Sequence, residues 1–150
     1  MLKLSQMVDS ENQEFRYILI NIGQVALTNG YVKFAEGVHC EVWLSKKAVK
    51  AIRKSPSKDR GRMSKILEHL SDYGPADLKD TQYKAERRLP TGGKNSKNVM
   101  VNVCKSYQLR VYGCWEDGPP RQFMCTEAII KKTNKADIEL LKRVAQRFGE

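Results

Sequence analysis

The segment from residue 105 to residue 148 constrains the fold more than any other part of this 150-residue chain. Its pattern predicts two strands joined at Glu116-Asp117-Gly118 and followed by an amphipathic helix. Arg110 lies inside the first predicted strand, and Lys131 and Lys132 end the second. The segment therefore concentrates fixed positive charge at one end of a small sheet.

Length and charge bound the class of protein. A chain of 150 residues is most simply one domain, and it is long enough to bury a core without disulfides. Lys and Arg number 27 against 17 Asp and Glu, which gives a formal net charge of +10. This balance favours a polyanionic partner, whether nucleic acid, an acidic protein or an anionic membrane surface. Charge alone does not choose among them.

The sequence gives no sign of a membrane segment. The apolar run from Tyr17 to Leu27 is too short to span a bilayer, and Asn21 and Gln24 interrupt it. No basic-then-apolar signal peptide opens the chain. We therefore expect a soluble cytoplasmic protein with no membrane partner.

The four cysteines are far apart in the sequence and form no C-x-x-C pair, which argues against a zinc site. We expect no metal and no other cofactor. The simplest interpretation is that the cysteines are small apolar residues on strands. The alternative is a nucleophilic thiol, for which only Cys40, beside His39, has a basic neighbour.

The N-terminal part of the chain is expected to precede the main domain. Asn29-Gly30 is a strong signal for a hairpin turn, because both turn positions need positive φ. The segments 24–28 and 31–34 flank it with strand-forming residues. Residues 1–38 are therefore predicted to be a tail and a β-hairpin extension, and residues 39–150 the globular domain.

A strand and two helices are predicted at the start of that domain. His39 to Leu44 has the composition of a strand, and Ser45 can cap a helix that runs to about Arg53. Ser57 can cap a second helix, which Gly74-Pro75 stop.

The remainder of the chain has the pattern of strands followed by one helix. Lys94 and Lys97 lie in a Gly-rich loop that lacks P-loop spacing, and we interpret it as a hairpin tip. Asn134 is predicted to N-cap the last helix, with Asp137 in its first turn. The predicted class is α+β, with helices packed on a twisted antiparallel sheet. The strands are Tyr83–Leu89, Val99–Val103 continuing or bending into Tyr107–Trp115, and Gln122–Ile130.

The closing segment resembles that of the RelE/ParE/HigB superfamily of bacterial toxins. The resemblance rests on Leu109-Arg110-Val111, the turn Asp117-Gly118, the strand Phe123–Ile130 and Lys131-Lys132-Thr133, which together are similar to the (Y/L)RV strand and KKT motif of the HigB-like branch. It covers roughly residues 39–148. It implies the RelE-like toxin fold, in which a strand, two helices, a run of antiparallel strands and a terminal helix follow one another.

The resemblance also implies an activity. RelE-like and HigB-like toxins are ribosome-dependent mRNA endoribonucleases of type II toxin–antitoxin systems, so RNA, the ribosome and a cognate antitoxin are the implied partners. Cleavage uses the RNA 2′-hydroxyl as nucleophile and needs no metal, only an acid, a base and cations around the phosphate. The oligomeric state stays open.

The resemblance marks Arg110 as the first catalytic candidate, because a guanidinium binds two phosphate oxygens. The alternative is an exposed arginine that pairs with a carboxylate. Lys132 and Lys131 follow, and at most one of them reaches the same substrate, since they point to opposite faces if both are in the strand. Arg88 is the fourth candidate, and its alternative is a cross-strand pair with a glutamate.

A second group of residues is predicted to bind RNA. Lys105 and Tyr107 combine a cation and an aromatic ring that could hold a phosphate and stack on a base. Tyr107 is otherwise an ordinary strand residue. Arg87, Lys94 and Lys97 complete the group.

Two other functions remain open on the sequence. After Tyr112 the chain has no His or Tyr, which are the acid or base of several such toxins. This absence and the N-terminal extension motivate a non-catalytic nucleic-acid- or protein-binding module, such as a phage or mobile-element protein, on the same fold. A ParE-like gyrase inhibitor is the other alternative.

Overall fold

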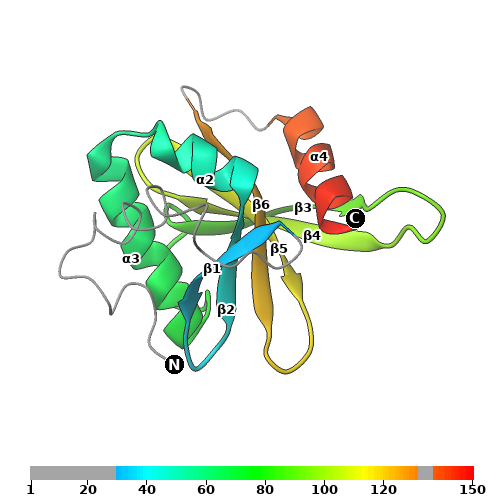
Figure 1. Cartoon of the computed structure of the whole chain (residues 1–150), viewed down its shortest axis with the longest axis horizontal. Coiled ribbons are helices and arrows are strands. Elements are labelled where there is room, and N and C mark those ends of the chain that lie inside the picture. Colours follow the sequence, from blue (N-terminus) through cyan, green and yellow to red (C-terminus); the bar gives the residue numbers. More distant parts are fainter. Residues whose placement is uncertain (1–29, 132–136) are drawn as a thin grey trace.

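The computed structural model describes residues 30–131 and 137–150 (Figure 1). In these residues the protein is α+β, a six-stranded mixed sheet with three helices. The order of elements agrees with the prediction for the globular domain. The elements are β1 (Tyr31–Glu36), β2 (Glu41–Ser45), α2 (Lys46–Arg53), α3 (Ser57–Tyr73), β3 (Tyr83–Pro90), β4 (Asn98–Lys105), β5 (Leu109–Glu116), β6 (Gln122–Ile130) and α4 (Ile138–Phe148).

The strands lie in the order β1-β2-β6-β5-β4-β3. Four neighbouring pairs are antiparallel, but β2 and β6 are parallel, with Val42 opposite Phe123. The prediction of an antiparallel sheet is therefore wrong at this pair. A parallel pair needs a long crossover connection, and here α2, α3 and three strands lie between β2 and β6.

The first strand is part of the main sheet. Residues 24–29 of the predicted hairpin lie outside the described residues, but β1 pairs with β2, with Val32 opposite Leu44. Val32 and Phe34 are fully buried in the same core as Leu44. Residues 31–36, which the sequence placed in an extension, therefore form an edge strand of the sheet.

Each face of the sheet has its own core. Because side chains alternate along a strand, the neighbours Val103 and Cys104 belong to different cores. The helices α2 and α3 cover one face, and α4 covers β3, β4, β5 and part of β6 on the other (Figure 1). The part of the second face over β1 and β2 is left as a groove.

The helix caps agree only in part with the prediction. Ser45 caps α2, since its hydroxyl accepts from Ala48 N–H at 3.0 Å. Ser57 is not a cap. It is the first residue of α3, because the carbonyl of Pro56 already accepts a helical hydrogen bond from Arg60.

The last helix is capped by Asp137, not by Asn134. The Asp137 carboxylate accepts from Glu139 N–H at 3.1 Å and from Leu140 N–H at 3.3 Å. These bonds satisfy two of the amide groups that a helix start leaves free. Asn134 lies outside the described residues.

The cysteines are buried, as predicted. Cys104, Cys114 and Cys125 lie on strands, and Cys40 directly precedes β2. Burial raises the pKa of the Cys104, Cys114 and Cys125 thiols, which disfavours the reactive thiolate. No helix in the described part of the chain is long and apolar enough to cross a membrane.

Candidate nucleic-acid interface

A buried carboxylate shapes the turn between β4 and β5. Asp59, in the first turn of α3, is 3% exposed. It accepts hydrogen bonds from Ser106 Oγ at 2.9 Å and from Gln108 N–H at 3.0 Å. The sequence left open whether the chain continues or bends here, and these contacts show that β4 and β5 are two antiparallel strands joined by a turn at 106–108.

Tyr107 lies at the tip of this turn, so its prediction as a strand residue is wrong. The residue is 49% exposed, with Lys58 Nζ 4.2 Å and Arg62 Cζ 5.0 Å from the ring centroid. The hydrogen bond from Arg62, assisted by the charge of Lys58, lowers the pKa of Tyr107 below its ordinary value. The turn therefore presents an exposed phenol that loses its proton more easily than most tyrosines.

Arg110 is held beside the same turn. Its Nη1 donates to the carbonyls of Ser106 at 2.7 Å, Tyr107 at 3.1 Å and Leu109 at 3.1 Å. The other guanidinium nitrogens make no hydrogen bond to the described residues. One nitrogen thus fixes the group, and the remaining edge is left for a bidentate acceptor such as phosphate.

Lys105 lies directly opposite Arg110 across β4 and β5, so both side chains are on the face that α4 partly covers. Burial lowers the pKa of Lys105, and the charges of Lys84 and Arg110 lower it further against the opposing effect of Glu86. The structure therefore brings Lys105 and Arg110 together, with Lys84 as a third cation.

The end of β6 meets the same region. Lys131 donates its backbone N–H to the carbonyl of Gln108 at 2.7 Å, which places it beside the turn. Lys132, the other lysine of the predicted pair, lies outside the described residues. We call the group formed by Lys58, Arg62, Lys105, Tyr107, Arg110 and Lys131 the basic end of the sheet.

Other predicted site residues lie elsewhere. Arg87 is opposite Val101 and shares the face of Lys105, whereas Arg88 is opposite Met100 on the other face. Arg88 is therefore not brought together with Arg110.

Lys94 and Lys97 lie in the loop that joins β3 to β4, at the start of β4, whereas Lys105 ends that strand. Seven residue steps separate the two ends of β4, roughly 24 Å at the usual rise of a strand. In Figure 1 this hairpin extends away from α3. The sequence grouped these two lysines with Lys105 and Tyr107, and the structure separates them.

The sequence prediction missed Lys58, Asp59 and Arg62 on α3. Lys58 and Arg62 are four residues apart and so lie on one side of the helix. Cations in the first turns of a helix oppose its macrodipole, which is the signal that could have marked them. For Asp59 there was no such signal, because an acidic residue in a first turn is common.

No family model, curated protein or solved structure matches this chain. Within residues 30–131 and 137–150, no three His, Cys, Asp or Glu side chains gather in a way that could hold a metal ion. At the basic end the fold brings the exposed phenol of Tyr107 together with Lys58 and Arg62, and it places Lys105 and Arg110 beside the same turn on the face that α4 partly covers.

Proposed function

We propose that the protein is an mRNA endoribonuclease of the RelE/HigB toxin type, acting on the translating ribosome and neutralised by a cognate antitoxin. The basic end of the sheet would bind the RNA backbone. The observation that carries the proposal is the convergence of Arg110, Lys105 and Tyr107 on one turn. From β2 onward the elements follow one another in the order that the resemblance to RelE-like toxins implies, which supports the proposal further.

The chemistry assigns a role to each group. The free edge of Arg110 would hold the scissile phosphate and, with Lys105 and Lys131, stabilise the negative charge that develops on it. Tyr107, whose pKa is lowered, would take the proton of the 2′-hydroxyl as its oxygen attacks phosphorus. Lys105, whose pKa is also lowered, would protonate the 5′-oxygen as its bond to phosphorus breaks. This assignment supplies the acid–base group that the C-terminal sequence lacks.

A second candidate function is binding without cleavage. Arg110 Nη1 already bonds to three backbone carbonyls, which is what an arginine with a structural role would do. In that case the cations of the basic end bind an RNA or another polyanion, and Tyr107 stacks on a base.

Induced expression in bacteria, with primer-extension mapping of an abundant mRNA, tests the proposal. We expect growth arrest and new translation-dependent 5′ ends from the native chain. Tyr107→Phe and Arg110→Ala should abolish them, while Arg88→Ala, an equal loss of charge on the opposite face, should leave them. Circular dichroism of the purified variants verifies that they fold.

Normal growth with intact mRNA would contradict the nuclease. Retention of RNA binding by the purified protein would then favour the second candidate. Gyrase-dependent DNA breaks with intact mRNA would instead favour a gyrase inhibitor.

A further inference from the structure

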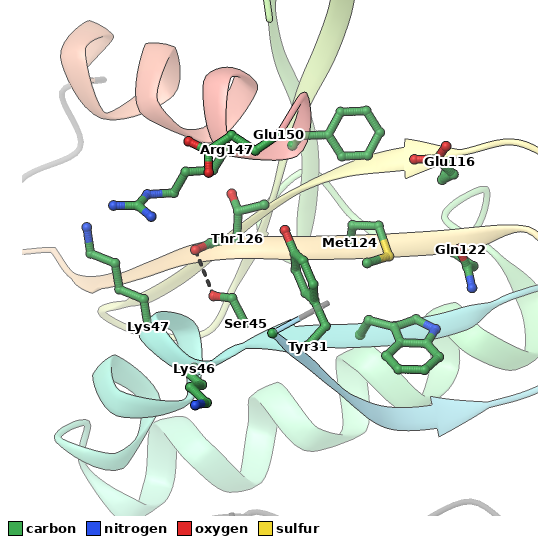
Figure 2. Close-up of a pocket in the computed structure, with 13 residues that line it drawn as sticks. Tyr31, Ser45, Lys46, Lys47, Glu116, Gln122, Met124, Thr126, Arg147 and Glu150 are labelled. Carbon is green, nitrogen blue, oxygen red and sulfur yellow. Dashed lines mark hydrogen bonds between the residues drawn. The ribbon is translucent and has the colours of Figure 1, made fainter. Parts of the chain in front are cut away.

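A groove lies on the α4 side of the sheet, apart from the basic end. It has a volume of about 980 Å³. Its floor comes from β1, β2 and β6, and the C-terminal end of α4 forms one wall (Figure 2). The residues that matter for its chemistry are Tyr31, Trp43, Ser45, Met124, Thr126 and Arg147.

One end of the groove is the N-terminus of α2. Lys46 and Lys47 are the first two residues of this eight-residue helix, and its first turn contains no acidic residue. The backbone N–H groups at a helix start have no intrahelical partner and carry positive partial charge. Two lysines there add like charge to that end, and a bound anion would relieve the repulsion.

A buried hydroxyl lies in the same groove, between the start of α2 and α4. Thr126 is 1% exposed, and its Oγ1 has no hydrogen-bond partner among the described residues. In Figure 2 its side chain points from β6 toward Arg147. An unpaired buried hydroxyl is costly, and a ligand oxygen that accepts from it would remove the cost.

The register of the sheet explains why Thr126 lies there. The pairing of β5 with β6 shifts by one residue at this point, so that Gly113 is opposite Cys125 and Tyr112 is opposite Glu127. Thr126 is the extra residue of a bulge, which re-aims side chains. Ser45 Oγ donates to the Thr126 carbonyl at 2.8 Å and fixes the bulge against the start of α2.

Lys47 and Arg147 at this end of the groove form ion pairs within the protein but remain partly exposed. Glu127, 2% exposed, pairs with Lys47 at 3.1 Å and with Arg147 at 2.8 Å, yet these two side chains remain 51% and 43% exposed. Lys46 has no ion-pair partner within the described ranges. The three lining cations, Lys46, Lys47 and Arg147, are offset by the lining carboxylates Glu116 and Glu150 and by Glu127 behind them, so the helix start is the remaining source of positive charge.

The middle of the groove is aromatic. Tyr31, Trp43 and Phe148 line it together with Met124. Burial raises the pKa of Tyr31 to about 12, so this phenol stays neutral. Gln122 and Glu116 lie at the far end and offer hydrogen-bonding groups beyond the rings.

We propose that this groove binds a nucleotide, with the phosphate at the N-terminus of α2 and the base against Tyr31 and Trp43. The phosphate would accept from Lys46, Arg147 and the Thr126 hydroxyl, and the aromatic rings would stack on the base. The nucleotide is either free or part of a single-stranded RNA. The inference does not depend on cleavage at the basic end.

Isothermal titration calorimetry of the full chain tests the proposal. The probes are the four ribonucleoside 5′-monophosphates, inorganic phosphate and a ribotrinucleotide. We expect saturable binding that phosphate weakens by competition. Thr126→Val, which keeps the shape and removes the hydroxyl, and Lys46→Gln should each weaken binding about tenfold.

The control is Lys50→Gln, which removes an equal charge from the same helix outside the groove. It should bind every probe as the native chain does, even if mRNA cleavage is never found. Equal affinity for monophosphate and trinucleotide identifies a free nucleotide as ligand, and binding of the trinucleotide alone identifies RNA. Absence of saturable binding by every probe, or an equal loss in Lys50→Gln, would overturn the proposal.

Discussion

The Asp59 carboxylate accepts a hydrogen bond from Ser106 Oγ at 2.9 Å, which joins the first turn of α3 to the turn between β4 and β5. Asp59 also accepts from the backbone N–H groups of Gln108 and Leu109. The phenol of Tyr107 is therefore positioned by a helix that begins 50 residues earlier in the chain. The basic end therefore depends on a tertiary contact between two segments that are far apart in the sequence.

Replacing Asp59 with alanine should destabilise the protein by about 1–3 kcal/mol, because buried N–H groups lose their acceptor. The midpoint of urea unfolding measures the change. Asp117→Ala is the control, since the Asp117 side chain is 99% exposed and should alter stability by less than about 0.5 kcal/mol. Equal midpoints for the two variants would show that the Asp59 contacts contribute no net stability.

Tyr107 should ionise before the buried tyrosines as pH rises. Arg62 and Lys58 lower its pKa below 10.0, whereas burial raises the pKa of Tyr83 and of Tyr112 to about 12. The tyrosinate absorbance of the native chain minus that of Tyr107→Phe isolates this group. Arg62→Gln should move the transition to higher pH.

If the Tyr107 phenolate is the base in RNA cleavage, the rate should rise with pH and level off above the pKa of this group. The reason is that only the deprotonated phenol accepts the proton. The pH profile of the purified protein on ribosome-bound mRNA measures the effect. A profile that is unchanged in Arg62→Gln would count against Tyr107 as the base.

Two pairs of cations should differ in their effect on RNA binding although each pair carries the same charge. The double variant Lys58→Gln, Arg62→Gln should reduce the slope of log affinity against log salt by about 1.4, the value for two lost contacts to single-stranded RNA. The double variant Lys94→Gln, Lys97→Gln should leave this slope unchanged, because these lysines lie at the opposite end of β4. Fluorescence anisotropy of a labelled RNA gives both slopes, and equal reductions would indicate binding by net charge alone.

The parts of the structure that depend on neighbours in sequence were predictable. Ser45 and Gly74 mark the start of α2 and the end of α3, and the strands from Tyr83 onward follow from alternation. The parallel pairing of β2 with β6 was not predictable, because it depends on the path by which the chain connects the two strands. At the candidate site, the sequence indicated Arg110 and Lys105, but the contribution of α3 required a contact between residues far apart in the chain.

Glu127 provides the last prediction. Its buried carboxylate joins Lys47 of α2 to Arg147 of α4, so Glu127→Gln should destabilise the protein by about 1–3 kcal/mol. The cost is below that of breaking a fully buried pair, since both cations can turn to water. Glu139→Gln, which breaks the exposed pair with Lys142 at 3.4 Å, is the matched control and should cost less than about 0.5 kcal/mol. Urea unfolding compares them, and equal effects would show that Glu127 does not hold the two helices together.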